Sequence, residues 1–190
     1  YKQFWNMKDK KGIIWKDGKS TEEILKNLSI SRLTENDIEQ VGEISAACLP
    51  VSDAHEAIEQ FYMTHGNIRQ SIKAYDRTTG QIYGILLLSD YPICCGSPIL
   101  DFKPELGKQL MHKRGINGFS FVIDGRLRGT DVHRRMLNSA LPFVSQFEYI
   151  WCAVADELKT HNYWKRLGFK EILVIPEACL LYTSPSPRDT

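Results

Sequence analysis

The sequence predicts an α/β (α+β) fold in which helices pack against one sheet. Its 190 residues are 43% hydrophobic, which suits a single domain with one core. Two runs rich in β-forming residues, 71–76 and 81–90, flank a short turn with Gly80 and predict an antiparallel hairpin. Residues 116–147 then follow the pattern of a strand, a glycine-containing turn and a helix.

The remaining elements follow from helix caps and from apolar periodicity. Ser20 and Glu23 have the spacing of a capping box, which predicts a short helix inside an N-terminal extension covering residues 1–27. Thr34 and Asp53 are expected to begin two helices that each bury one apolar face. In order, we expect a helix at 20–26, a strand at 30–33, helices at 34–48 and 53–66, strands at 71–76, 81–90 and 116–124, a helix at 130–147, a strand at 149–155, a helix at 160–167 and a strand at 169–175.

Charge and cysteine content exclude several classes of partner. The formal net charge is +1, so no global field favours nucleic acid or an anionic membrane. The longest apolar runs fall far short of the ~20 residues of a membrane helix. Five cysteines without metal-ligand spacing predict no metal site and reduced thiols in a soluble, cytoplasmic protein. Cys94 and Cys95 lie in a long expected connection, 91–115, without a neighbouring histidine that would activate them as nucleophiles.

The segment Arg126-Leu127-Arg128-Gly129-Thr130-Asp131 has the layout of a phosphate-binding loop at a helix N-terminus. Gly129 allows the backbone to approach an anion closely, and Arg126 and Arg128 supply charged donors. The alternative is a basic, solvated helix start. Cations at that end oppose the helix dipole by about 0.3–1 kcal/mol each, which favours an anion between them.

Residues 121–131 resemble the acetyl-CoA motif of the GNAT superfamily, an apolar strand followed by Gln/Arg-x-x-Gly-x-Gly/Ala. Arg126 and Gly129 match, and Asp131 stands where the family has glycine or alanine. Residues 163–169 are similar to the family's aromatic-Tyr-x-Lys/Arg-x-Gly-Phe segment. Trp164 takes the tyrosine position there and Tyr163 precedes it, although ordinary aromatic packing would also account for both.

The resemblance implies a mixed, mostly antiparallel central sheet flanked by helices over residues 28–178. It also implies an N-acetyltransferase that transfers the acetyl group of acetyl-CoA to a primary amine by direct attack in a ternary complex. The acceptor would be a small molecule or a protein, with no nucleic acid and no membrane involved. The cosubstrate would contact Val122, Ile123, Arg126, Leu127, Arg128, Gly129, Thr130, Asp131 and Trp164.

The expected catalytic residues are Asp124 and Tyr163. Asp124 is the carboxylate nearest to strand 116–123, but a role in binding local backbone N–H groups is an alternative, and His112, Glu157 or a water chain could serve as the base instead. Tyr163 would protonate the leaving thiolate. A second hypothesis, motivated by Asp131 and Trp164, is a GNAT-like module that binds acyl-CoA or a partner protein without turnover.

Residues 179–190 resemble the translation of a sequencing-library adapter. We therefore expect a non-native or disordered tail, with Pro185 and Pro187 blocking regular structure. The last strand of the family's sheet would then be truncated. The resulting open edge would lower solubility or allow pairing with a second chain in a homodimer.

Overall fold

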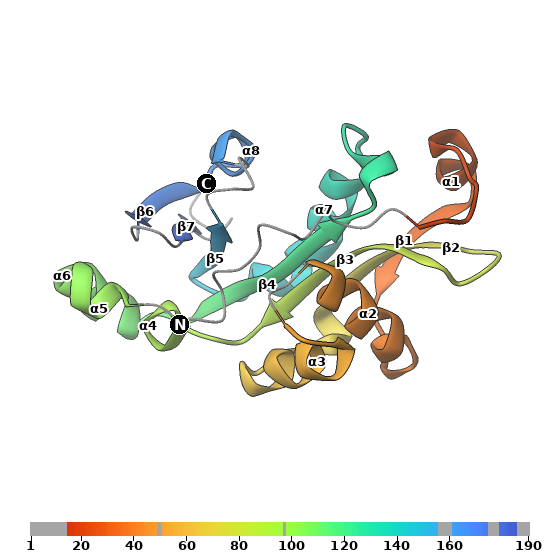
Figure 1. Cartoon of the computed structure of the whole chain (residues 1–190). Coiled ribbons are helices and arrows are strands. Elements are labelled where there is room, and N and C mark those ends of the chain that lie inside the picture. The colour runs from red at the N-terminus through yellow and green to blue at the C-terminus, as the bar shows by residue number, and fades with distance from the viewer. Residues whose placement is uncertain (1–14, 49–50, 97, 156–160, 175–178, 186–190) are drawn as a thin grey trace.

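The structure is a computed structural model that describes residues 15–48, 51–96, 98–155, 161–174 and 179–185. One twisted sheet runs through it (Figure 1), and in the described residues it has seven strands in the order β1-β2-β3-β4-β5-β7-β6. Only the β4–β5 pair is parallel. The strands are β1 (Leu28–Arg32), β2 (Ile72–Asp76), β3 (Ile82–Ser89), β4 (Gly115–Ile123), β5 (Tyr149–Ala155), β6 (Lys170–Val174) and β7 (Cys179–Pro185). The mixed, mostly antiparallel sheet flanked by helices is confirmed.

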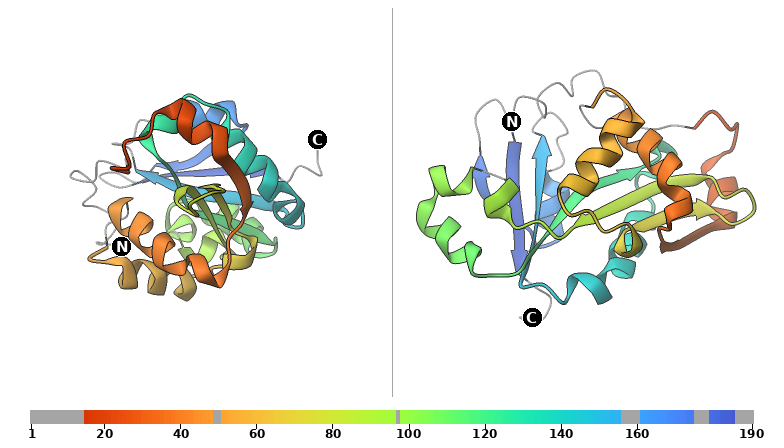
Figure 2. Two further views of the ribbon diagram at one scale, coloured as in Figure 1. Left: turned by 90° about the vertical axis from the view of Figure 1, so that its right-hand side faces the viewer. Right: turned by 90° about the horizontal axis from the view of Figure 1, so that it is seen from below.

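Helices cover both faces of the β1–β4 part of the sheet. Helices α2 (Ile38–Cys48) and α3 (Ala54–Met63) lie on one face, and α1 (Thr21–Asn27) and α7 (Val132–Val144) lie on the other (Figures 1 and 2). Strand β3 is therefore buried at every position. The structure also contains the short 3-10 helices η3 (Glu35–Asp37), η4 (Ile68–Gln70) and η5 (Gly125–Leu127), and the helix α8 (His161–Arg166).

The capping box at the start of α1 is present. Ser20 accepts a hydrogen bond from the Glu23 backbone N–H, and the Glu23 side chain accepts one from Ser20 N–H. Ile24 is fully buried in the same apolar cluster as Val132 and Met136 of α7. Helix α1 therefore packs as part of the domain, although the sequence placed it in an extension.

Residues 91–115 differ from the expected irregular connection, because they form α4 (Ile93–Gly96), α5 (Ile99–Phe102) and α6 (Pro104–Met111). Their apolar side chains, Ile93 and Ile99 among them, pack on Tyr149 and Trp151 of β5. Pro104 occupies the first turn of α6, where its missing N–H costs nothing. The prolines mark helix starts in this segment as well as turns.

The C-terminal segment differs from the expected disordered tail over residues 179–185, and its resemblance to a translated adapter stays a prediction. Residues 179–185 form strand β7, which lies between β5 and β6 and pairs antiparallel with both. The sheet is therefore not truncated after β6. Pro185 is the last residue of the strand and lies two residues beyond Thr183, where the pairing with β6 ends. Residues 186–190 lie outside the described residues.

Membrane insertion has no support in the helices that the structure describes, since none of them is both long and apolar enough to cross a bilayer.

A buried carboxylate holds the β2–β3 hairpin together. Asp76 has no exposed side-chain surface, and its Oδ2 lies 2.6 Å from Lys19 Nζ. Its Oδ1 accepts hydrogen bonds from the Thr78 and Thr79 backbone N–H groups in the turn. The hydrogen bond from Lys19 is the largest of the causes that hold the pKa of Asp76 well below its ordinary value.

We expect Asp76→Asn to lower the free energy of unfolding by about 2 kcal/mol at neutral pH, because it removes the charged partner of Lys19. A lowered folded pKa contributes stability that is complete above the unfolded value of about 4 and is lost as the pH falls below it. Urea unfolding of wild type and variant should show a stability gap that is constant above pH 5 and shrinks below pH 4. A gap that grows on acidification would contradict this role.

Candidate active site

Strands β4 and β5 stay together for only a short distance. Their parallel pairing joins Gly115–Asn117 to Tyr149–Trp151. Beyond it, β4 continues along β3 and β5 continues along β7. Phe119 is a bulge in β4, since Leu87 and Leu88 of β3 lie opposite Ser120 and Gly118. A bulge bends its strand, so β4 turns away from β5 and no described strand pairs with its edge beyond residue 117.

The backbone of Ile123 points to this open edge. Asp124 N–H donates to Tyr83 O on β3 at 2.7 Å. Backbone groups alternate in direction along a strand, so Val122 also faces β3, and Phe121 and Ile123 face away from it. Of Val122 and Ile123, the two strand residues expected to contact the cosubstrate, Ile123 has a backbone N–H that lies on the open side.

The loop after β4 leads into helix α7 with several free backbone donors. Gly129 has φ +81°, and a Cβ built there would meet no atom within 4 Å. Among the described residues, the backbone N–H groups of Gly129, Asp131, His133 and Arg134 donate no hydrogen bond. Open space and unsatisfied donors therefore coincide at the N-terminus of α7, which is the arrangement that binds an anion.

The other residues of this loop maintain its shape. Leu127 is fully buried in the core, and its N–H donates to Asp124 O. Arg128 N–H donates to Gly125 O, and the Arg128 side chain is exposed. Thr130 donates to Leu127 O through both its N–H and its hydroxyl. The Asp131 side chain is exposed and makes no capping hydrogen bond.

Arg126 does not face the open space. Its Nε and Nη2 donate to the two oxygens of Asp124 at 3.0 and 2.9 Å. Its Nη1 donates to Asp17 Oδ1 at 2.6 Å and to Lys19 O at 2.7 Å, and the guanidinium lies over the ring of Tyr83. This position differs from the expectation that the guanidinium is available to a phosphate.

Asp124 is also committed to this network. Its side chain has no exposed surface, and its oxygens accept hydrogen bonds from Trp15 N–H, Arg126 N–H and the Arg126 guanidinium. Burial raises the pKa of Asp124, but the hydrogen bonds from Arg126 and Trp15 outweigh it and leave the pKa below its ordinary value. Such a carboxylate is a weak base, and its contacts fit the alternative of a residue that binds local backbone groups.

Aromatic side chains of α8 fill one side of the gap between the parting strands. Trp164 packs on Cys152 of β5 and contacts Phe121 of β4 and Phe169. Tyr163 lies edge-on to Trp164 and to His133 at the start of α7, with ring centroids 5.3 Å apart in both cases. The sequence segments 121–131 and 163–169 therefore meet in space.

The Tyr163 hydroxyl is buried and has no hydrogen-bond partner among the described residues. Burial raises its pKa to about 12, with Arg134 acting in the opposite direction. The hydroxyl is therefore protonated at neutral pH. It is in the state that a proton donor needs, and Tyr163 lies next to the N-terminus of α7.

The alternative bases and the cysteines lie elsewhere or outside the described residues. His112 is exposed at the end of α6, before β4 begins and thus at the opposite end of that strand from Ile123. Glu157 falls outside the described residues. The Cys94 thiol donates to Gly107 O, and burial raises its pKa, so it is not an activated nucleophile.

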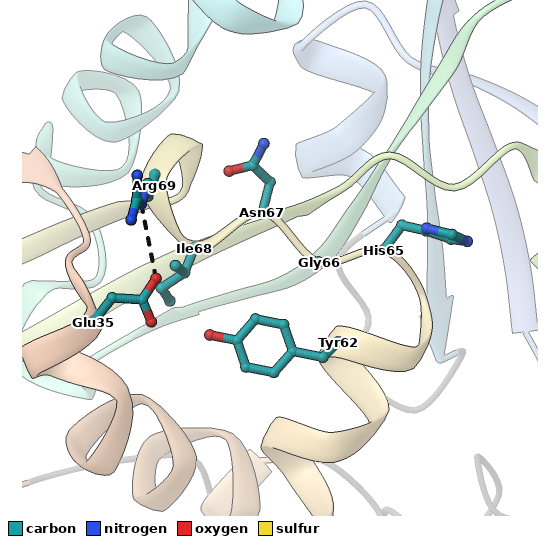
Figure 3. A pocket seen from close by; sticks show the side chains of 7 residues that line it. All are labelled: Glu35, Tyr62, His65, Gly66, Asn67, Ile68 and Arg69. Atoms are coloured by element: carbon teal, nitrogen blue, oxygen red, sulfur yellow. Dashed lines mark ion pairs between the residues drawn. The ribbon is translucent and has the colours of Figure 1, made fainter.

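A separate open pocket lies beside α3 (Figure 3). It is lined by Glu35 of η3, Tyr62 of α3 and residues 65–69. Glu35 and Arg69 form a 3.8 Å ion pair across it, and both side chains are largely exposed. An exposed pair of this kind contributes little binding or stability. None of the predicted site residues lines this pocket, so we place the candidate site at the open edge of β4.

The sequence matches no protein-family model and no curated protein. The structure is similar to many solved ones. PH1933 from Pyrococcus horikoshii has a TM-score of 0.59 at 13% identity over 84% of this chain and 98% of its own. Naa50 from Arabidopsis thaliana, solved with the bisubstrate analogue CoA-Ac-MVNAL, has a TM-score of 0.56 at 13% identity over 83% and 98%. A GNAT-family acetyltransferase from Staphylococcus aureus has a TM-score of 0.57 at 11% identity over 83% and 98%.

The chain has the GNAT fold. In this GNAT fold the parting of β4 from β5, the loop 125–131 and α8 lie next to one another, and they contain the predicted residues of the segments 121–131 and 163–169. Sequence reasoning missed Asp17, Lys19 and Tyr83. No local pattern could have found them, because Asp17 and Arg126 are 109 positions apart in the sequence.

We expect Tyr163→Phe to leave the free energy of unfolding unchanged or to raise it by up to about 1 kcal/mol, because it removes a buried hydroxyl without a partner. Tyr149→Phe is the matched control. The pKa of Tyr149 is likewise raised to about 12 by burial, but its hydroxyl accepts a hydrogen bond from Ile93 N–H. Its loss should cost about 1 kcal/mol in urea unfolding. Equal destabilisation by both changes would show that Tyr163 also has a partner.

Proposed function

We propose that the protein is an N-acetyltransferase that uses acetyl-CoA and a primary amine. The observation that carries the proposal is the continuity between the open edge of β4 and the free N–H groups at the start of α7. An extended pantetheine chain can pair with a strand edge, and a pyrophosphate suits backbone donors at a helix N-terminus. Both features lie at the same end of β4.

The residues present fit the charge of coenzyme A. Backbone N–H groups of Gly129, Asp131, His133 and Arg134 would hold the pyrophosphate, and the exposed Arg128, Arg134 and Arg135 side chains would supply positive charge. The Asp131 side chain is exposed and uncommitted, so it can turn towards solvent, away from the phosphates. Arg126 takes no part in this contact.

The chain would contribute to the reaction in three ways: by polarising the carbonyl, by protonating the leaving thiolate and by packing against the acyl group. Ile123 N–H would polarise the thioester carbonyl, to whose carbon the amine nitrogen forms a bond as the carbon–sulfur bond breaks. The Tyr163 hydroxyl would give its proton to the departing thiolate, and Trp164 would pack beside the acyl chain. Since Asp124 is committed to Arg126, we assign removal of the amine proton to water at the open edge.

A second candidate is a module that binds acyl-CoA without turnover. The commitment of Asp124 and the packing of Tyr163 among aromatic rings favour it. The two candidates differ in one result, since only the enzyme releases free thiol when acetyl-CoA and an amine are both supplied.

Acetyl-CoA should raise the melting temperature. At a concentration of a hundred times Kd the stabilisation is about 2.7 kcal/mol, or about 5–10 °C for a chain of this size. Gly129→Trp should abolish the shift, because the side chain would fill the open space over the loop. Binding is measured by differential scanning fluorimetry and confirmed by calorimetry.

Gly80→Trp provides the matched control. Gly80 also has a positive φ, +75°, and open space around its Cβ position, but it lies in the hairpin turn between β2 and β3. Both variants should therefore melt at similarly lowered temperatures, and only Gly80→Trp should keep the acetyl-CoA shift. A wild-type chain that is folded and shows no shift would refute the proposed binding site.

Turnover separates the enzyme from the binding module. Thiol release is measured with acetyl-CoA and a panel of polyamines, arylalkylamines and peptides with free N-termini. Tyr163→Phe should lower the rate about 100-fold without changing the acetyl-CoA melting shift, because a proton donor acts only on the chemical step. A wild-type rate in this variant would exclude Tyr163 as the acid, and binding without thiol release for any amine would favour the module.

A further inference from the structure

A short stretch before β1 reaches across to the loop that follows β4. We call this stretch, residues 15–21, the N-terminal arm. Four hydrogen bonds join it to Asp124 and Arg126: Trp15 N–H to Asp124 Oδ2 at 3.1 Å, Arg126 Nη1 to Asp17 Oδ1 and to Lys19 O, and Thr21 Oγ1 to Arg126 O at 2.9 Å. The arm is itself anchored to the sheet, through Lys19 on Asp76 and through Asp17 on the Tyr83 hydroxyl.

These contacts use most of the hydrogen-bonding capacity of Arg126. A guanidinium has five N–H donors, and four hydrogen bonds to Asp124, Asp17 and Lys19 O engage it here. The hydrogen bonds that Arg126 donates to Asp124 and then to Asp17 raise the pKa of Arg126 further, so its charge is permanent. Arg126 is therefore an anchor inside the protein, and the charge it carries is already balanced by two carboxylates.

The anchor controls the backbone of the loop. Arg126 is held at its N–H by Asp124, at its carbonyl by Thr21 and at its side chain by Asp17. Gly129, with its free N–H, comes three residues later, inside a turn closed by the hydrogen bond from Thr130 N–H to Leu127 O. If Arg126 is released, the start of this turn loses its fixed point, and the free donors are no longer held in one direction.

We propose that Asp17 is a positioning residue for the anion-binding loop, and that it acts through Arg126. The inference rests on the proposed function for the identity of the anion, the phosphates of coenzyme A. It assigns to the N-terminal arm the task of holding the loop in the conformation that binds them. Release of Arg126 towards the phosphates is disfavoured, because it would leave Asp124 buried without its partner.

The test measures the Kd of coenzyme A by calorimetry for the full chain and three variants. Asp17→Asn should weaken binding about tenfold, the equivalent of one charge-assisted hydrogen bond, and Asp17→Glu should restore part of the loss. Arg126→Lys should weaken binding at least as much, because an ammonium cannot bridge Asp124, Asp17 and Lys19 O together. If Arg126 instead bound the phosphates directly, Arg126→Lys would keep most of the affinity for coenzyme A, since lysine binds phosphate well.

Asp37→Asn is the matched control for lost stability. Like Asp17, Asp37 forms an ion pair with a basic side chain, in this case Lys73 at 2.7 Å. Both side chains are nearly buried on the α2 side of the sheet. This variant should melt at a lower temperature and bind coenzyme A like the wild type. Wild-type affinity in Asp17→Asn or in Arg126→Lys would overturn the positioning role.

Amide hydrogen exchange gives a readout that does not depend on coenzyme A. Asp17→Asn should speed the exchange of Leu127 and Thr130 N–H about tenfold, because both hydrogen bonds depend on the fixed turn, whereas Asp37→Asn should leave it unchanged. If the wild-type chain binds no coenzyme A, the proposed function fails, and exchange still decides whether Asp17 holds the loop. Unchanged exchange in Asp17→Asn would overturn the inference in either case.

Discussion

The ion pair between Asp124 and Arg126 determines the geometry at the end of strand β4. Asp124 has no exposed surface, and a buried carboxylate without a partner would destabilise the fold by about 3–5 kcal/mol. Arg126 donates three of the hydrogen bonds that the Asp124 side chain accepts, and Trp15 N–H donates a fourth. The pair therefore connects the N-terminal arm with the end of β4 and the loop that begins α7, although Asp17 and Arg126 are 109 positions apart in the sequence.

In this arrangement the charged side chains stabilise the fold, and the backbone N–H groups are left to bind a ligand. The charged groups next to β4 are balanced among themselves, so the donors left for a ligand are backbone N–H groups around Gly129. Exposed arginines at the start of α7 oppose the helix dipole in the absence of an anion. The bulge at Phe119 adds the second requirement, because it turns β4 away from β5 and leaves the backbone of Ile123 unpaired by any described strand.

Sequence patterns predicted the parts of the fold that depend on local rules. The capping box at Ser20, the hairpin around Gly80 and the strand-turn-helix unit at 116–147 are all present, because caps, turns and periodicity act over a few residues. Apolar packing on β5 converted the expected connection 91–115 into three short helices, and pairing on both sides gave residues 179–185 a strand. Both outcomes depend on contacts across the sheet that no local window contains.

The sequence singled out two segments that lie close together in the structure, and their role in binding a cosubstrate stays a prediction. The segments 121–131 and 163–169 meet through Phe121 and Trp164, and Tyr163 lies against His133 at the start of α7. The sequence suggested Arg126 as a phosphate donor, but its partner Asp17 lies 109 positions away and takes up that donor.

The most direct measurement is a coenzyme A titration followed by the backbone amide resonances of the full chain. We expect the largest shifts on Ile123, Gly129 and Asp131, whose N–H groups face the open edge and the start of α7. Shifts that gather instead around Tyr62 and residues 65–69, or no shifts in folded protein, would contradict it.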